Sequence, residues 1–321
     1  MSFCRTELWN TNLTWNTETP QFTECFQSTV LVYTPAAVLL LSSSLDIFNC
    51  ARSKVRTIPW SPLLISKVSI TSVILVLSCL ELSSVVISSF SSVAEILDPS
   101  IKILCFILSL GNIIINKHFG QVYSAAQLFF WSSLSICQLM VLVSLSMQEY
   151  PGDSSLINFI LQVFYFLLAV VMSILNWFAD SQPLYADLLE QVDDNPCPKK
   201  FASLPSRILF AWFDQLILKG WRNPLTQKDL WSLNSEDSLQ EIVPPLEDKL
   251  FRRDEKASVL STLFKTYWTK FLILTFFYLA KTLLQLANPQ IINLMISFVA
   301  ENEEQWKGYL YMVLFGCVFL G

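Results

Sequence analysis

The chain has 321 residues, of which 53% are hydrophobic and 15% are charged, and its formal net charge is −5. Soluble domains carry about a quarter charged residues, so this composition argues against an ordinary soluble protein. The sequence has no concentrated basic face, which argues against nucleic acid as a partner.

Apolar residues gather into runs of about twenty, the length that a helix needs to cross roughly 30 Å of hydrocarbon. Because lipid offers no hydrogen-bond partner to an exposed backbone, each run is predicted to be a helix, and the fold class is all-α integral membrane. Six full spans and the start of a seventh are predicted, at Ser28–Cys50, Pro62–Ser88, Pro99–Asn116, Ser124–Met147, Leu156–Phe178, Trp268–Ala300 and Tyr309–Gly321. The apolar run that stops at Gly321 is what we expect of a fragment or an incomplete gene model.

The charges of the connecting loops predict the orientation. Bases occupy the first and third loops, at Arg52, Lys54, Arg56, Lys117 and His118. Acids occupy the second and fourth loops and the one after the sixth span, at Glu95, Asp98, Glu149, Asp153, Glu301, Glu303 and Glu304. Positive charge stays cytoplasmic, so the N-terminus is predicted to be outside. Lys102 is the exception, and we expect it to snorkel from an outer helix end.

Residues 1–27 are therefore predicted to be an external tail, too long and too acidic for a cleavable signal. Asn12-Leu13-Thr14 is an acceptor for N-glycosylation, which is usable only in the lumen. Cys4 and Cys25 are the only cysteines of the tail, in a compartment that permits a disulfide between them. With no CxxC motif and a single histidine, no metal site is predicted.

A polar linker, residues 179–256, follows the fifth span and is predicted to be cytoplasmic. Within it, Ser206–Lys219 has apolar residues at three- and four-residue spacing, with Ser206 as the N-cap and Gly220 at the end. This pattern predicts an amphipathic helix that lies in the headgroup region or packs on neighbouring helices. The alternative is a surface helix of a soluble insert.

The linker carries the most specific motifs. These are Ser206-Arg207-Ile208, Trp212, Gly220-Trp221-Arg222-Asn223-Pro224-Leu225 and Asp229-Leu230-Trp231-Ser232-Leu233-Asn234 with Glu236-Asp237. They resemble a segment of the C subfamily of ATP-binding cassette exporters, the multidrug-resistance-associated transporters. The resemblance extends to Asn12–Thr17, Cys25–Gln27, Asp180, Pro183-Leu184, Asn195–Pro198 and Pro289–Ile292, and so to essentially the whole chain.

The resemblance implies an architecture. Residues 28–178 would be the extra five-span membrane domain, and residues 179–256 the lasso linker that packs on the transporter core. Residues 257–321 would hold an elbow helix, the first core helix and part of the second. The lasso-motif residues would be Arg207, Trp212, Pro224, Asp229 and Trp231. The linker is shorter between Pro245 and Ala257 than in the longest members.

Lys281 lies near the middle of the sixth predicted span and shares a helix face with Tyr278, Thr282 and Gln285. A charge deep in a membrane is a candidate functional site, and this face offers an anion one cation and several hydrogen-bond donors. The resemblance implies that the face lines the substrate path and holds anionic conjugates such as glutathione adducts. Tyr278 stands where some members have lysine and Lys281 where they have histidine. The alternative for Lys281 is an interhelical ion pair or hydrogen bond.

Other polar residues of the spans have structural interpretations. Glu81 shares a face with Lys67, and a contact inside the bundle is favoured over a relay, while Lys67 is expected to snorkel. His118 is expected to be solvated. Pro289 is predicted to kink its helix. The serine clusters, at Ser42–Ser44, Ser83–Ser84 and Ser88–Ser92, favour close helix packing over a polar pore.

No GxxxxGK[ST] loop occurs, so no cofactor and no catalytic site are predicted for this chain. ATP and magnesium are cofactors that the resemblance implies for a full-length protein. The expected function is the N-terminal part of an ATP-driven exporter of amphipathic organic anions, surrounded by lipid and joined to the transporter core. The plasma membrane is the expected location and the vacuolar or lysosomal membrane the alternative. The competing functions are a stand-alone membrane interaction module and a seven-span receptor, against which the long linker argues.

Overall fold

The computed structural model describes residues 3–52, 57–87, 92–147, 153–180, 197–232, 239, 243–244, 259–301 and 303–320. The described residues form helices and contain no strand, which confirms the all-α fold class. The chain divides into two compact units, Met1–Ser232 and Leu233–Gly321. Several residues considered above lie outside the described part, namely Lys54, Arg56, Ser88–Ser91, Glu149, Pro183-Leu184, Asn195-Pro196, Leu233-Asn234, Glu236-Asp237, Pro245, Ala257 and Gly321.

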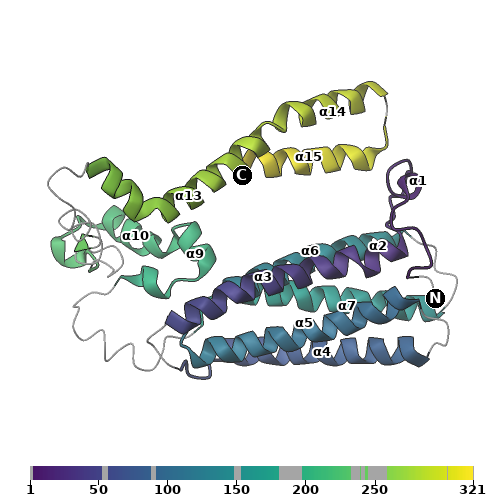
Figure 1. Ribbon diagram of the computed structural model, residues 1–321, viewed down its shortest axis with the longest axis horizontal. Coiled ribbons are helices and arrows are strands. Elements are labelled where there is room, and N and C mark those ends of the chain that lie inside the picture. The colour runs from purple at the N-terminus through teal and green to yellow at the C-terminus, as the bar shows by residue number, and fades with distance from the viewer. Residues whose placement is uncertain are drawn as a thin grey trace. The chain divides into compact units, whose positions relative to one another are not determined.

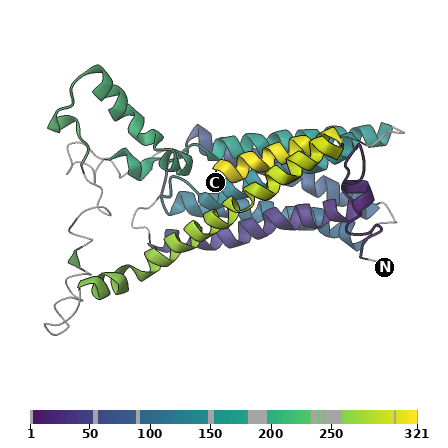
Figure 2. The same cartoon turned by 90° about the horizontal axis from the view of Figure 1, so that it is seen from above.

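Five long helices form the membrane bundle of the first unit and run side by side (Figures 1 and 2). They are α3 (Val30–Arg52, preceded by the short α2, Glu24–Ser28), α4 (Pro62–Ile87), α5 (Val93–His118), α6 (Ala125–Ser146) and α7 (Asp153–Asn176). Each has at least 22 residues, about 33 Å at 1.5 Å per residue, which is enough to cross the hydrocarbon core.

Length and composition mark five candidate membrane spans in the described residues: Glu24–Phe48, Pro62–Ile87, Ala125–Ser146, Phe159–Asn176 and Leu260–Glu301. The 26-residue α5 is not among them, although it equals α4 in length. It starts at Val93 and not at Pro99 as predicted, because Ser92 and Glu95 form a capping box that begins the helix earlier.

The bundle packs around an aromatic core. Phe106 of α5 stacks on Trp131 of α6 at 5.8 Å between ring centroids, and Tyr165 of α7 meets Phe106 edge-on at 6.1 Å. Many outward-facing side chains are large and apolar, such as Leu41 and Ile87, as a surface turned to lipid requires.

The serine side chains are satisfied within the bundle. Those of Ser42 and Ser83 bond to carbonyls of the preceding helical turn, and Ser135 of α6 bonds to Ser173 of α7 at 2.9 Å. The described clusters therefore fit helix packing, as interpreted from the sequence.

The described linker is a series of short helices: η1 (Pro198–Phe201), α9 (Leu204–Ile208), η2 (Ala211–Phe213), α10 (Asp214–Arg222) and η3 (Gln227–Asp229). The predicted continuous helix Ser206–Lys219 is wrong, because Phe210 adopts a left-handed conformation with φ 57° and interrupts it. Ser203, not Ser206, caps the first piece, by accepting a hydrogen bond from the Ser206 amide. Gly220 lies inside α10 and does not end it.

The second unit contains α13 (Val259–Gln285), α14 (Asn288–Glu301) and α15 (Gln305–Leu320). α13 is kinked at Tyr267, and the predicted span Trp268–Ala300 is interrupted just before Pro289, which confirms the kink expected there. α14 and α15 pack closely at Gly308, where a Cβ atom would lie 2.7 Å from the Phe298 ring.

Candidate functional site

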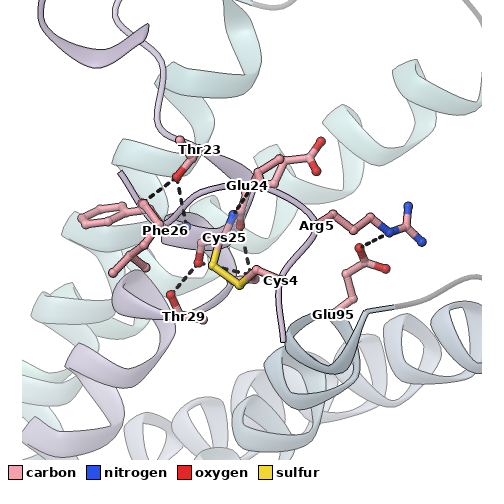
Figure 3. Close-up of a disulfide and its surroundings, with 11 residues drawn as sticks. Cys4, Arg5, Thr23, Glu24, Cys25, Phe26, Thr29 and Glu95 are labelled. Atoms are coloured by element: carbon pink, nitrogen blue, oxygen red, sulfur yellow. Dashed lines mark hydrogen bonds and ion pairs between the residues drawn. A yellow bond between two sulfur atoms is a disulfide. The ribbon is translucent and has the colours of Figure 1, made fainter. Parts of the chain in front are cut away.

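A disulfide joins Cys4 of the N-terminal tail to Cys25 in α2, with their Cα atoms 5.6 Å apart (Figure 3). Beside it, the Arg5 guanidinium pairs with the Glu95 carboxylate at 3.3 Å. The amide of Ala94 donates to the carbonyl of Phe3 at 3.1 Å. The tail is thus fastened to the first turn of α5 and to the helix that leads into α3.

Replacing both Cys4 and Cys25 with serine is expected to lower the free energy of unfolding by about 2–4 kcal/mol, because the disulfide restricts the unfolded tail. Denaturant unfolding of the chain in lipid nanodiscs measures the difference. The matched control is Cys79→Ser, which changes an exposed free cysteine of α4. If the double variant were as stable as the control, the disulfide would contribute nothing to the fold.

The glycosylation candidate Asn12 lies in α1 (Thr11–Thr14), a short helix of the tail, and its side chain is exposed. Its side-chain oxygen accepts a hydrogen bond from the Asn16 amide at 3.2 Å. Thr14 is buried, and its hydroxyl donates to the carbonyl of Gln21 at 3.1 Å. The exposed Asn12 side chain leaves room for a glycan.

Three charged side chains meet inside the bundle, close to the tail. The Lys102 ammonium of α5 lies 2.9 Å from the Asp98 carboxylate and 3.2 Å from the Glu81 carboxylate of α4. Only 7% of the Lys102 side chain is exposed. The prediction that Lys102 snorkels to the headgroup region is therefore wrong, because its ammonium group forms ion pairs with Asp98 and Glu81. The contact predicted for Glu81 is confirmed, with Lys102 as its partner.

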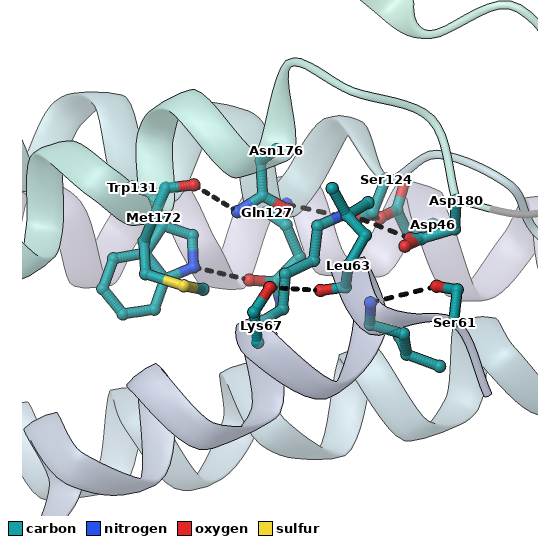
Figure 4. Close-up of polar contacts among 12 residues, drawn as sticks. Asp46, Ser61, Leu63, Lys67, Ser124, Gln127, Trp131, Met172, Asn176 and Asp180 are labelled. Atoms are coloured by element: carbon teal, nitrogen blue, oxygen red, sulfur yellow. Dashed lines mark hydrogen bonds and ion pairs between the residues drawn. The ribbon is translucent and has the colours of Figure 1, made fainter.

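Polar side chains join α3, α5 and α6 deeper in the bundle (Figure 4). The Gln127 carbonyl accepts hydrogen bonds from the Ser109 hydroxyl at 2.8 Å and from the Trp131 indole at 2.9 Å. The Ser124 hydroxyl donates to the Asp46 carboxylate of α3. Gln127 connects α6 to α5 and Ser124, the N-cap of α6, connects it to α3, so these hydrogen bonds fix how the three helices pack.

The linker is bound to the other end of the bundle by an ion pair. The Lys67 ammonium of α4 lies 3.0 Å from the Asp180 carboxylate, and both side chains are largely buried (Figure 4). The Asp180 amide donates to the carbonyl of Val122 at 2.8 Å. Burial raises the pKa of Asp180, and the Lys67 charge opposes that shift. The prediction that Lys67 snorkels is wrong, because this carboxylate lies within its reach.

Arg207 provides a second attachment at the same end. Its guanidinium donates to the Tyr123 hydroxyl at 2.7 Å and lies 4.6 Å from the centre of that ring. A further hydrogen bond runs from Arg207 to the carbonyl of Lys199 at 3.0 Å. Tyr123 lies between α5 and α6, whereas the tail binds the first turn of α5. Tail and linker therefore occupy opposite ends of the bundle.

The other lasso-motif residues gather in one small structure. Trp231 lies 5.8 Å from both Trp212 and Phe213, measured between ring centroids. The Asp229 carboxylate accepts from the Lys219 ammonium at 2.5 Å, and also from the amide and hydroxyl of Thr226. These hydrogen bonds, the one from Lys219 first, hold the pKa of Asp229 well below its usual range.

Pro224 follows Asn223, whose extended backbone ends α10 as a residue before proline requires. Pro224 thereby turns the chain from α10 towards Thr226, the N-cap of η3. The structure brings Trp212, Asp229 and Trp231 together around this turn, while Arg207 faces the bundle.

Comparison with known proteins decides the family. Residues 2–160 match the model of the ABC transporter TMD0 domain. The ATP-binding cassette sub-family C member 3 of Mus musculus is 26% identical over 98% of this chain and 23% of its own length. Member 3 of Homo sapiens is 26% identical over 95% of this chain and 22% of its own length. Member 2 of Homo sapiens is 22% identical over 97% of this chain and 23% of its own length. The chain belongs to the C subfamily of ATP-binding cassette transporters.

Membership confirms the resemblance that the linker motifs indicated. The chain spans less than a quarter of the length of these C-subfamily relatives. It corresponds to an N-terminal part of such a transporter, and the multi-pass membrane location follows from its apolar helices and its family.

Lys281, Tyr278 and Gln285, the substrate-face candidates of this C-subfamily chain, all lie in α13 and are exposed. The Thr282 hydroxyl of the same face donates to the carbonyl of Tyr278 at 2.8 Å. In the most apolar stretch of α13–α14, none of the residues is buried inside the chain. Lys281 is accessible on this helix, and its role in binding a substrate stays a prediction.

Proposed function

We propose that the chain is the N-terminal part of an ATP-driven exporter of amphipathic organic anions. The bundle acts as an accessory membrane domain, the linker docks on the transporter core, and α13 forms one wall of the substrate path. ATP and magnesium act at cassettes outside these 321 residues.

The two attachments of the linker to the bundle carry this proposal. Asp180 and Arg207 lie on either side of residues 181–196, and both bind the same end of the bundle, through Lys67 and Tyr123. Because the bundle binds the linker both before and after residues 181–196, it fixes where the motif around Trp212 and Trp231 begins. That motif is then available to bind the segment that follows the linker. In a C-subfamily transporter the segment that follows is the core.

The orientation we propose has the tail outside and the linker in the cytoplasm. Support comes from the disulfide at the tail end, since such bonds persist in oxidising compartments. The opposite end carries Lys67, Lys117 and Arg207, in keeping with positive charge on the cytoplasmic side. The plasma membrane is the location we favour over a vacuolar or lysosomal membrane.

Replacing Lys281 with methionine in the full transporter is expected to reduce uptake of a glutathione conjugate into inside-out vesicles about tenfold, because an anionic group would lose a charged hydrogen-bond partner. Lys265→Met is the matched control, since Lys265 is exposed on the same helix, before the kink at Tyr267. Equal uptake by both variants would remove Lys281, and with it Tyr278 and Gln285, from the substrate path. If the unsubstituted transporter showed no ATP-dependent uptake at all, an interaction module would be favoured instead.

A further inference from the structure

A cavity of about 680 Å³ lies at the tail end of the bundle. Its wall includes residues of the tail, of α2 and of all five long helices of the bundle. Sites for small molecules have volumes of roughly 300–1,000 Å³, so this cavity is large enough for one. Neither the linker attachments nor α13 takes part in it, so the proposed export function does not use it.

The external tail closes part of this cavity. Cys4, Arg5 and Cys25 line it, and the disulfide and the Arg5–Glu95 ion pair hold the tail in place there (Figure 3). The cavity is therefore a built feature of the bundle and its tail.

The charges along the wall do not balance, because it carries two cations, Arg5 and Lys102, and four carboxylates, Glu24, Glu81, Glu95 and Asp98. Lys102 is the cation of the buried cluster, and it faces two carboxylates, Glu81 and Asp98, all three of which line the cavity. Glu95 is already paired with Arg5. One negative charge of the cluster is left over, and a surplus charge in a site of low dielectric constant is costly unless a cation compensates it.

A second observation comes from Tyr165, which also lines the cavity. The residue is 6% exposed, and its buried hydroxyl has no hydrogen-bond partner among the residues that the structure describes. An unsatisfied buried hydroxyl costs stability, and a ligand that donates or accepts a hydrogen bond would remove that cost. The centre of the Tyr165 ring lies 5.8 Å from the Lys102 ammonium, so Tyr165 is next to the charged cluster.

The remaining wall combines polar side chains with a set of hydrocarbon side chains. Its hydrocarbon side chains come from α3, α4, α6 and α7, at Leu31, Val32, Leu77, Leu80, Val141 and Leu161. A ligand that fits the cavity must therefore combine a polar group with a hydrocarbon part. An anion is disfavoured, because the Lys102 ammonium is already bound by two carboxylates.

We propose that this cavity binds an amphipathic compound with a primary ammonium group. The ammonium group lies against the Glu81 and Asp98 carboxylates and hydrogen-bonds to the Tyr165 hydroxyl, and the hydrocarbon part lies on the leucine and valine side chains. Either a phospholipid with an ethanolamine headgroup or a soluble amine presents this chemistry.

The test uses the purified chain in phosphatidylcholine nanodiscs, titrated with phenethylamine and followed by calorimetry and by the thermal unfolding midpoint. We expect saturable binding that raises the midpoint, and no such effect from the uncharged 2-phenylethanol. In Glu81→Gln the affinity should fall about tenfold or more, because a charged hydrogen bond is lost. Tyr165→Phe removes a single hydroxyl and should weaken binding several-fold. Asp214→Asn, an exposed carboxylate of α10 outside the cavity, is the matched control.

A parallel titration in nanodiscs that contain phosphatidylethanolamine identifies the source of the ligand. Weaker apparent binding of phenethylamine there shows that the lipid headgroup already occupies the cavity, whereas equal binding shows a site for soluble amines. Absence of saturable binding, equal binding of 2-phenylethanol, or unchanged affinity in both cavity variants would overturn the proposal. If Glu81→Gln does not fold, the Tyr165→Phe result decides.

Discussion

Lys102→Met is expected to lower the free energy of unfolding of the bundle by about 3 kcal/mol, because it leaves the largely buried Asp98 carboxylate and the partly exposed Glu81 carboxylate without their cation. In the chain, Lys102 binds Asp98 at 2.9 Å and Glu81 at 3.2 Å, with 7% of its own side chain exposed. Unfolding of the purified chain in mixed micelles with increasing fractions of dodecyl sulfate measures the change.

The control for this prediction is Lys228→Met, which changes an exposed lysine of η3 and should leave the unfolding free energy within about 0.5 kcal/mol of the original. A triple variant, Lys102→Met with Glu81→Gln and Asp98→Asn, should recover much of the lost stability, since no uncompensated charge remains. If Lys102→Met were as stable as the control, Lys102 would not be buried in the bundle.

Arg207→Ala is expected to release the linker from the bundle while leaving the bundle folded. The guanidinium both donates to the Tyr123 hydroxyl at 2.7 Å and lies over its ring, and these contacts together are worth roughly 2 kcal/mol or more in a partly buried site. Hydrogen exchange across residues 197–209 should speed up, and Cys197, the free cysteine that precedes η1, should react faster with a thiol reagent by about tenfold.

Arg222→Ala is the matched control, because Arg222 is exposed at the end of α10. Its exchange and labelling rates should equal those of the unchanged chain. Tyr123→Phe removes only the hydroxyl and should give an intermediate result. Unchanged protection of residues 197–209 in Arg207→Ala would show that the linker is held to the bundle without this contact.

The sequence predicted the membrane helices well because their signal is local. A run of about twenty apolar residues identifies a span whatever it packs against. The same is true of Pro289, whose effect on its own helix follows from its missing amide. The linker motifs are also local, and the family comparison confirmed the subfamily that they indicated.

The partners of buried charges could not be predicted in the same way. Lys67 and Lys102 both lie near the ends of the predicted spans, so each was expected to reach the headgroups. Their partners come from elsewhere in the chain: Asp180 follows Lys67 by 113 residues, and Glu81 precedes Lys102 by 21. Periodicity gives the face of a helix on which a residue lies, but not the neighbouring helix that this face meets.

The linker shows a second limit of prediction from the sequence. Helical spacing of apolar residues continues through Ser206–Lys219, yet Phe210 adopts a left-handed backbone conformation. Neither Phe210 nor the residue on either side of it is a glycine or proline that would have predicted this break. The break accompanies a cluster in which Trp212 and Phe213 lie against Trp231, a tertiary contact that helical spacing does not predict. The cavity at the tail end depends on the packing of five helices, and only its charged residues could be noticed in the sequence.

The most direct test of the central account is the topology of the two ends of the bundle. The chain is expressed in mammalian cells, and the glycan at residue 12 and the labelling of Cys197 by a membrane-impermeant thiol reagent are measured together. The account predicts that a glycosidase shifts the mobility of the chain, that Asn12→Gln abolishes the shift, and that Cys197 reacts only after the membrane is permeabilised. An unglycosylated Asn12 together with labelling of Cys197 in intact cells would contradict it.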